Sequence, residues 1–220
     1  MAYRRAMSDP ADTSDLPVKK LVVFDFDGTL TTADTFVAFM KYYHGAARWY
    51  AKMVPLAGTF LAYKLGRIDR HAVKDAVVGA AFGGEPWSAV EASAQAFAAE
   101  VIPGLMRPLG LVRLRERLGE ADAGGPEVVI CSASISPYLE AYLRPLGVGR
   151  IVACELEMDE SGMCTGTLRG FNVWGENKMK ALREAFPRAR LYLCESYGDS
   201  EGDRALLDAA NVPFWRPFRD

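Results

Sequence analysis

Two aspartates follow a short apolar run near the start of the chain. In the stretch VFDFDGTLTTADT, residues 23–35, Asp25 and Asp27 end a strand-like segment and Gly28 comes directly after them. Residues two apart in an extended chain point to the same side, so the two carboxylates are expected to face one spot. Paired acids at a strand end need a compensating cation, and the stretch therefore predicts a metal site.

Further polar residues follow other strand-like runs. Ser132 and Ala133 come after the run VVIC, and the loop GDSEGD, which holds Asp199 and Asp203, comes after the run ARLYLCE. Lys178 stands at the start of a helical stretch that precedes this loop. Because ligands of open α/β sheets bind beyond the carboxyl ends of the strands, these side chains are expected to meet on one rim.

This set of groups suits a divalent cation and a phosphate. Four carboxylates on one rim repel one another unless a cation lies among them, and oxygen ligands that leave room for water and phosphate suit Mg²⁺. With the cation in place, a phosphate can approach Asp25 despite its charge. Lys178 and Ser132 can then bind the phosphate oxygens.

The elements that position these residues alternate between strands and helices. Short, continuous, β-branched apolar runs are typical of strands buried on both faces of a parallel sheet. Five such runs are LVVFD (21–25), EVVICS (127–132), RIVAC (150–154), ARLYLCE (189–195) and NVPFW (211–215). Helical patterns cover residues 137–147, 177–186 and 201–210, so the chain is predicted to form a doubly wound α/β fold.

Two segments depart from this alternation. Residues 154–170 read as a hairpin with its turn at 159–162, an antiparallel excursion from the main sheet. About a hundred residues separate the first two strands, far more than a crossover needs. Helices are expected in this insert over residues 34–43, 46–65, 69–81, 86–102 and 105–118. The predicted division is a disordered tail (1–17), a core domain (18–32 and 120–220) and a helical cap domain (33–119).

The ordered motifs resemble the haloacid dehalogenase superfamily, in its phosphoserine-phosphatase-like branch. DFDGTLT, the serine after the second strand, the lysine and GDSEGD occur in the family's order and span Val22 to Asp203. The helical insert directly after the first motif is similar to the cap of that branch. The resemblance implies a Rossmann-like core and a Mg²⁺-dependent phosphatase of a small phosphorylated metabolite such as phosphoserine.

The resemblance also implies a role for each matching residue. Asp25 would be the nucleophile that takes the phosphoryl group as an aspartyl-phosphate. Asp27 would protonate the leaving oxygen and then activate water as a base. Ser132, Ala133 and Lys178 would bind the phosphoryl oxygens.

The same resemblance implies a metal shell and one substrate contact. Mg²⁺ would be held by the Asp25 side chain, the Asp27 main-chain carbonyl and Asp199, with Asp203 supporting that shell. Asp34 stands where the phosphoserine phosphatases have a glutamate, one methylene longer, and would contact substrate.

The chain departs from the branch in residues that bear on substrate choice. Gly202 replaces an asparagine, and Ala133-Ser134-Ile135 replaces a glycine-containing continuation. Nothing matches the cap arginine that grips a substrate carboxylate, although Arg67 and Arg70 are available. The phosphoryl chemistry survives these changes, whereas recognition of an amino acid does not follow from them.

An apolar part of the insert leaves a second substrate class open. The stretch WYAKMVPLAGTFLAYKLG, with Arg48, Lys52 and Lys64 at its edges, could form a groove for an acyl chain and an anionic headgroup. A lipid-phosphate phosphatase, similar to phosphatases of phosphatidylglycerophosphate, is therefore the alternative. Packing of the cap helices against each other is the favoured interpretation, because apolar helix faces are mostly core, and contact with a membrane surface is not favoured.

Two other activities share this frame. One is phosphoryl transfer to an acceptor other than water, and the other is a catalytically silent binding module. Dehalogenases of the superfamily lack the second aspartate, and receiver domains lack both a large cap and that acid. Asp27 therefore argues against a dehalogenase and against a silent module, while transfer to another acceptor stays open.

Composition excludes several further classes. The net charge is −2 with 50% hydrophobic and 25% charged residues, and no basic run suggests nucleic acid. No apolar segment follows Arg4 and Arg5 as in a secretory signal, and the charge-free stretch 53–63 is too short to span a bilayer. The four cysteines form no CxxC pair, which predicts reduced thiols in a cytoplasmic protein. The sequence specifies no oligomeric state.

Overall fold

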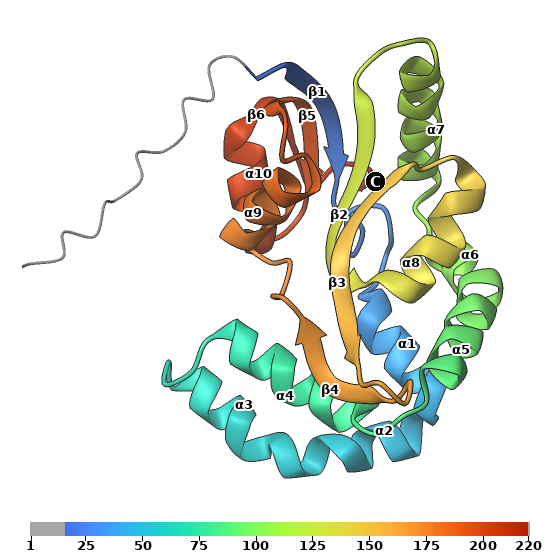
Figure 1. Cartoon of the computed structure of the whole chain (residues 1–220), viewed down its shortest axis with the longest axis vertical. Coiled ribbons are helices and arrows are strands. Elements are labelled where there is room, and N and C mark those ends of the chain that lie inside the picture. The colour runs from blue at the N-terminus through green and yellow to red at the C-terminus, as the bar shows by residue number, and fades with distance from the viewer. Residues whose placement is uncertain (1–15, 220) are drawn as a thin grey trace, which may run out of the picture.

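A six-stranded sheet forms the centre of the molecule. The computed structural model describes residues 16–219. Residues 1–15 of the predicted tail lie outside this range. The strand order is β4-β3-β2-β1-β5-β6, and all neighbours are parallel except β3 and β4. The strands are β1 (Val18–Phe24), β2 (Glu127–Ile135), β3 (Arg150–Met158), β4 (Cys164–Arg169), β5 (Arg190–Gly198) and β6 (Ala210–Trp215). The predicted α/β fold is confirmed (Figure 1).

The five predicted strands are all present, and several are longer than the apolar runs. The second half of β1, from Leu21 to Phe24, is buried, as expected for a strand between two others. The fourth predicted strand was expected to end at residue 195, but β5 continues to Gly198. Its last residues are buried, and Tyr197 stacks on Phe24 with ring centroids 4.3 Å apart. Aromatic packing thus extends the strand to the edge of the acidic loop.

Helices cover both faces of the sheet. In Figure 1, α9 (Glu176–Ala185) and α10 (Arg204–Ala209) lie on one face, and α7 (Pro108–Asp122) and α8 (Ser136–Leu143) lie on the other. The predicted helix over 201–210 begins as a 3₁₀ turn, Glu201–Asp203, and the predicted helix over 137–147 ends as one, Arg144–Leu146. The second change follows from Pro145, which lacks the N–H of an α-helical bond.

The insert between β1 and β2 is helical, as predicted. Its α-helices are α1 (Thr35–His44), α2 (Ala46–Met53), α3 (Ala57–Lys64), α4 (Arg70–Phe82), α5 (Trp87–Glu100), α6 (Ile102–Leu105) and α7 (Pro108–Asp122). One helix was expected over 46–65, and this was wrong. Pro55 divides it into α2, a 3₁₀ turn over Val54–Leu56 and α3, because proline cannot donate the α-helical bond.

Different parts of the insert pack against different neighbours. Helix α5 packs against α8, and α7 packs against β2, so both lie on core elements. Helices α2 and α3 pack against α4, which in turn packs against β4. The division into a core domain and a cap domain at residues 33–119 stays a prediction.

The hairpin β3–β4 connects the sheet to the insert. It turns over 159–162, as predicted, and the Asp159 carboxylate accepts hydrogen bonds from the backbone N–H groups of Ser161 and Met163. Gly166 has φ +87°, and a Cβ there would lie 3.0 Å from the Cα of Gly83 and 3.2 Å from that of Gly79. Helix α4 therefore rests on β4 backbone to backbone.

All four cysteines are free thiols. Cys131, Cys154 and Cys164 are buried and Cys194 is half-buried. The three buried thiols agree with the expectation that the cysteines pack in the interior. No helix within residues 16–219 combines the length and the apolar character that a membrane span requires.

Candidate active site

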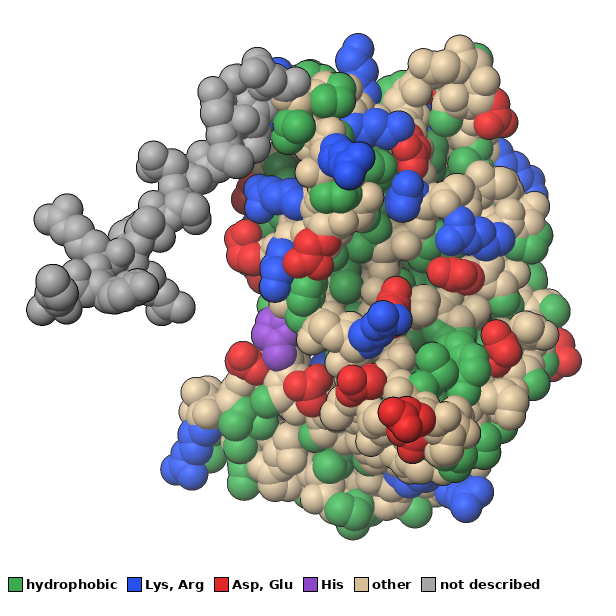
Figure 2. Space-filling model, in the orientation of Figure 1, with side chains coloured by type: hydrophobic (Ala, Val, Ile, Leu, Met, Phe, Trp, Pro, Cys, Tyr) green, Lys and Arg blue, Asp and Glu red, His purple; other side chains and the backbone are tan. Residues whose placement is uncertain are grey.

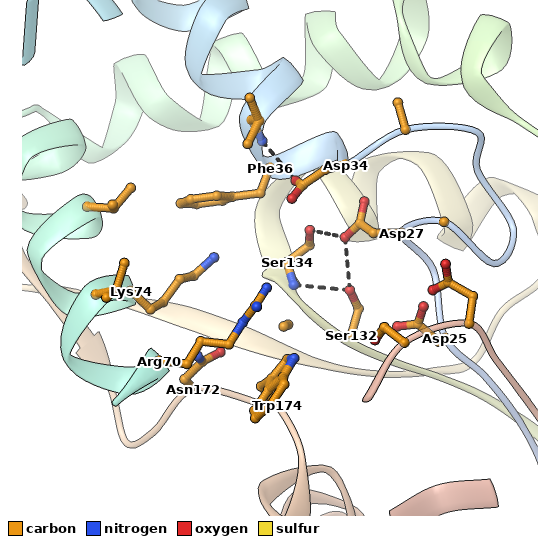
Figure 3. Close-up of a pocket in the computed structure, with 18 of the residues that line it drawn as sticks. Asp25, Asp27, Asp34, Phe36, Arg70, Lys74, Ser132, Ser134, Asn172 and Trp174 are labelled. Atoms are coloured by element: carbon orange, nitrogen blue, oxygen red, sulfur yellow. Dashed lines mark hydrogen bonds between the residues drawn. The ribbon is translucent and has the colours of Figure 1, made fainter. Parts of the chain in front are cut away.

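The carboxyl ends of β1, β2 and β5 open into a cavity of about 700 Å³ between the sheet and the insert. Its floor carries the residues that the motifs singled out: Asp25, Asp27, Ser132, Ala133, Lys178 and Asp199. Its walls come from α1, α2, α3 and α4. The structure thus brings the predicted site residues together from segments far apart in the chain (Figure 3).

Asp25 and Lys178 form a buried ion pair. Asp25 follows β1, and its backbone N–H donates to the Tyr197 carbonyl across to β5. Lys178 Nζ lies 2.6 Å from Asp25 Oδ1, and the side chains of Lys178 and Asp25 are 2% and 7% exposed, respectively. The ammonium also donates to the Cys131 carbonyl at 2.9 Å. Lys178 therefore holds one carboxylate oxygen of Asp25, and no hydrogen bond from the residues that the structure describes engages the other.

The Asp203 carboxylate binds Lys178 and the loop that carries Asp199. Its Oδ1 lies 2.5 Å from Lys178 Nζ. Its Oδ2 accepts hydrogen bonds from the backbone N–H groups of Asp199 and Ser200 at 3.1 and 2.9 Å, and from the Ser200 hydroxyl. Both carboxylate oxygens of Asp203 are thus engaged in fixing the loop and the lysine.

Asp199 lies at the mouth of this cluster. A Cβ at Gly28, where φ is +77°, would lie 2.5 Å from Asp199 Oδ2, so only glycine leaves room for this carboxylate. Arg219 contacts the same atom, with Nη2 2.6 Å from Asp199 Oδ2. The carboxylates of Asp25, Asp199 and Asp203 offer oxygen atoms within 4.8 Å of one another.

The Asp27 side chain faces away from that acidic cluster. Its Oδ1 accepts from the Thr35 N–H at 2.7 Å and from the Thr35 hydroxyl at 2.5 Å. Its Oδ2 accepts from the hydroxyls of Ser134 and Ser132, the latter at 3.4 Å (Figure 3). The α1 N-terminus and the end of β2 therefore fix this carboxylate beside the cavity.

Burial and neighbouring charges set the proton affinities of these acids. Burial raises the pKa of Asp25 to about 8, against the opposing charge of Lys178. Burial also raises the pKa of Asp27, the charge of Asp34 adds to it, and the hydrogen bonds from Ser134 and Thr35 act the other way. A raised pKa favours the protonated form of Asp27, which is the form that a general acid needs.

The supporting acid Asp203 behaves in the opposite way. Burial acts to raise its pKa, but the Lys178 ammonium and the hydrogen bonds of Ser200 outweigh that effect and hold the pKa below its usual value. Asp203 therefore stays ionised and keeps Lys178 charged. Burial and the charge of Asp203 raise the pKa of Asp199.

Asp34 lies beside the cavity and caps a helix. Its Oδ1 accepts from the backbone N–H of Val37, which makes it the N-cap of α1. This bond explains why a short acid suits the position, since Asp is among the best N-cap residues. Ala133 lines the cavity too, and its carbonyl accepts from the Cys154 thiol.

Two basic side chains on α4 face the acids across the cavity. Lys74 Nζ lies 3.1 Å from the centroid of the Phe36 ring, and burial lowers the pKa of this lysine. The Arg70 guanidinium lies 5.0 Å from the Trp174 ring centroid. Figure 3 shows both pointing into the cavity, next to Asn172. The wall opposite Asp25 is thus aromatic and positively charged.

Several of these residues were missed from the sequence. Ser134 had a usable signal, because it lies two residues beyond Ser132 on the same strand. Arg70 was named as an available cap arginine and lines the cavity, whereas Arg67 does not. Lys74 lies four residues after Arg70 on the same helix face, and it was missed because nothing in the sequence relates that face to Asp25. Arg219 lies after the last strand, and its contact with Asp199 depends on the fold of the chain end.

The acidic cluster suits a hard divalent cation. Its donors are carboxylate oxygens, which Mg²⁺ prefers, and they are partly buried around one point. Lys178 neutralises part of their charge, so the net charge left is one that a divalent ion can balance. Asp25 and Asp199 retain oxygens for a metal, whereas those of Asp203 are used by the loop and the lysine.

The family follows from a comparison with known proteins. The model of the haloacid dehalogenase-like hydrolases matches residues 22–208. The chain belongs to this family. The superfamily resemblance of the motifs is thereby confirmed.

Relatives of this hydrolase agree with that assignment. Protein CicA of Caulobacter vibrioides is 35% identical over 200 residues, which is 90% of this chain and 86% of CicA. A Bordetella pertussis protein of unknown function has a similar structure, with TM-score 0.68 and 21% identity over 89% of each chain. A probable phosphoserine phosphatase from Vibrio cholerae also has a similar structure, with TM-score 0.59 and 16% identity. The match covers 92% of this chain and 58% of the Vibrio cholerae chain. The two structures share the fold of this hydrolase.

Proposed function

We propose that this hydrolase is a Mg²⁺-dependent phosphatase that cleaves a small phosphomonoester through an aspartyl-phosphate on Asp25. The observation that carries the proposal is the separation of two carboxylates at one strand end. Asp25 is held by Lys178 at the acidic cluster, while Asp27 is held by Thr35 and Ser134 beside it. One acid can therefore act as nucleophile while the other manages protons.

The acidic cluster accounts for the metal in this proposal. Asp25 and Asp199 would hold Mg²⁺, and Asp203 would position them through Lys178 and the loop backbone. When bound, the ion neutralises the charge of the phosphoryl oxygens so that the anionic nucleophile can approach them. The Asp27 main-chain carbonyl remains the further ligand that the family resemblance implies.

The first step forms the covalent intermediate. A carboxylate oxygen of Asp25 attacks phosphorus, and the bond between phosphorus and the ester oxygen breaks. Asp27 in its protonated form gives its proton to that leaving oxygen, and an alcohol departs. Lys178 and the Ser132 hydroxyl bind the phosphoryl oxygens, whose charge they stabilise as the bond breaks.

The second step releases inorganic phosphate. Asp27, now ionised, takes a proton from a water molecule, whose oxygen attacks phosphorus. The bond from phosphorus to Asp25 breaks and restores the carboxylate. Thr35 and Ser134 keep the Asp27 carboxylate in one orientation through both steps, which is the condition for it to serve as acid and then as base.

The proposed substrate is a small phosphorylated metabolite with a second anionic group. Lys74 and Arg70 lie opposite the phosphoryl site and can bind a carboxylate such as that of phosphoserine. The similarity to the Vibrio cholerae probable phosphoserine phosphatase supports this size of substrate. Asp34 lies nearby and can accept a hydrogen bond from an amino group.

A lipid phosphate is the second candidate, and one observation favours it. The wall formed by α2 and α3 contributes apolar side chains to the cavity, among them Met53, Phe60 and Tyr63. Phe60 and Tyr63 are also exposed, so an acyl chain could leave the cavity along them. Turnover of phosphoserine compared with that of a lysolipid phosphate separates the two candidates.

The variant Asp25→Asn tests the proposed function. It should lose hydrolysis of a generic aryl phosphate in the presence of Mg²⁺, because an amide oxygen is a poor nucleophile. Asp208→Asn is the matched control, since Asp208 is an exposed acid on α10. Counting free phosphate per ester consumed distinguishes hydrolysis from transfer to another acceptor. If Asp25→Asn keeps wild-type turnover, the nucleophile is another group.

A further inference from the structure

The segment α2–α3 carries apolar side chains that no part of the described chain covers. Helix α3 reads AGTFLAYK, and none of its residues is buried. The most exposed apolar side chains of the segment are Val54 at 71%, Leu61 and Leu65 at 58%, and Tyr50 at 57%. The expectation that this stretch packs as core is correct for Trp49, which is buried, and wrong for these four.

These side chains form two pairs along the segment. Tyr50 and Val54 lie four residues apart at the end of α2, and Leu61 and Leu65 lie four residues apart at the end of α3, so each pair shares one face of its helix. Other side chains of the segment line the cavity, namely Trp49, Met53, Phe60 and Tyr63. The four exposed side chains Tyr50, Val54, Leu61 and Leu65 are named here the outer face.

The charges within the segment itself are of one sign. Residues 46–68 contain four basic residues and no Asp or Glu. Arg48, Lys64 and Arg67 are exposed, while Lys52 turns inward and donates to the Ala80 carbonyl. Figure 2 shows hydrophobic and basic side chains along the lower rim, where α2 and α3 lie, and the acidic side chains in view lie above them.

Apolar side chains together with basic charge distinguish between two partners for the outer face, a second copy of the chain and a lipid bilayer. A second copy of the chain, docked by a two-fold axis, would set the same basic residues against one another. An anionic bilayer offers the opposite charge and takes up an apolar stripe flanked by Lys and Arg at its headgroup boundary. Charge therefore favours the bilayer over a dimer.

We propose that the outer face of α2–α3 docks this hydrolase on the surface of an anionic lipid bilayer. Val54, Leu61 and Leu65 enter the headgroup boundary, and Arg48, Lys64 and Arg67 bind lipid phosphates. Other side chains of the same segment line the cavity, so docking sets the cavity beside the membrane. Docking would give the cavity access to phosphomonoesters carried by lipids, and this consequence rests on the proposed function. The docking itself does not rest on it.

Vesicle co-sedimentation tests the docking surface. The full chain should bind vesicles of phosphatidylglycerol with phosphatidylcholine, bind phosphatidylcholine vesicles far less, and release from the former as salt is raised. The triple variant Val54→Ser/Leu61→Ser/Leu65→Ser should bind at least about tenfold more weakly. The pair Arg48→Gln/Arg67→Gln should lose about fivefold per residue. Leu109→Ser/Val112→Ser is the matched control, because these side chains on α7 are 56% and 52% exposed.

Three outcomes overturn the proposal. One is the absence of binding to the anionic vesicles, and another is binding by the triple variant equal to that of the wild type. The third is a dimer, seen by light scattering, that the triple variant converts to a monomer. Unchanged turnover of a soluble aryl phosphate by the triple variant establishes that it is folded. Asp25→Asn should bind vesicles like the wild type, so failure of the proposed function and failure of docking remain distinguishable.

Discussion

Lys178 Nζ lies 2.6 Å from Asp25 Oδ1, although 153 positions separate the two residues along the chain. Both side chains are buried, and the same ammonium contacts Asp203 at 2.5 Å. One cation thus neutralises part of the acidic cluster and orients the proposed nucleophile. The strength of this arrangement can be measured by removing the cation.

Lys178→Met should destabilise the protein and abolish most turnover. Removing one partner of a buried ion pair costs about 3 kcal/mol, since the carboxylates are left without a counter-charge. Turnover should fall about a hundredfold, because a charge that stabilises the transferring phosphoryl group is lost. Urea unfolding and aryl phosphate hydrolysis measure the two effects. Lys180→Met, at an exposed site on the same helix, should change neither; equal behaviour of the two variants would contradict the assignment.

Gly28→Ala should weaken metal binding by moving Asp199. An added Cβ would lie 2.5 Å from Asp199 Oδ2, and the backbone has φ +77°. Gly45→Ala is the matched control, because Gly45 has φ +75° and nothing within 4 Å of an added Cβ. Both variants should lose about 1–2 kcal/mol to backbone strain. Calorimetric titration with Mg²⁺ should show weaker binding in Gly28→Ala alone, and equal affinities would refute the steric argument.

Arg219→Ala should strengthen metal binding. The Arg219 guanidinium contacts the Asp199 carboxylate at 2.6 Å and so competes with a cation for that oxygen. The pair is partly exposed, which limits the gain in Mg²⁺ affinity to about fivefold. The shift of the unfolding temperature with added Mg²⁺ reports the affinity without turnover. Arg204→Ala removes an exposed ion pair with Glu201 and should leave the shift unchanged. A weaker Mg²⁺ response in Arg219→Ala would mean that the arginine supports the site.

His44 should make folding stability depend on pH. Burial and the charge of Lys52 lower the pKa of His44 below 6.5 in the folded chain. The unfolded chain then binds the proton more readily, so this contribution is complete above pH 6.5 and is lost as the pH falls toward the folded pKa. As the pH is lowered from about 7 to about 5, the free energy of unfolding should therefore fall less in His44→Gln than in the wild type. His71→Gln is the control, and a wild-type pH dependence in His44→Gln would exclude His44 as the source.

The sheet and the acidic cluster could be predicted because their signals are local. Buried β-branched runs mark the strands, and acids placed at the ends of those runs must meet wherever parallel strands share an edge. Lys178 and Asp203 were predicted as site residues from the order of the motifs, and their ion pair shows that the two side chains lie together in the fold. The roles of these residues in catalysis stay predictions.

The cavity walls could not be predicted in the same way. The partners of Asp27 come from α1 and β2, and the residues opposite Asp25 come from α4, whose position depends on its contact with β4. The exposed face of α2–α3 also escaped prediction, because an apolar helical pattern reads the same whether or not a neighbour covers it. Contacts between elements, rather than patterns within them, determine these features.

The glycine contact between α4 and β4 has a consequence for the length of the molecules that the cavity can hold. Helix α4 carries Lys74 and Arg70, and it rests on the hairpin through Gly79, Gly83 and Gly166. A larger residue at position 166 would push that helix outward, and its two cations with it, while Asp25 and Asp27 stayed in place. Under the proposed function these three glycines, none of which lines the cavity, set the distance from Asp25 to the cations of α4, and changing them should lengthen the molecules accepted.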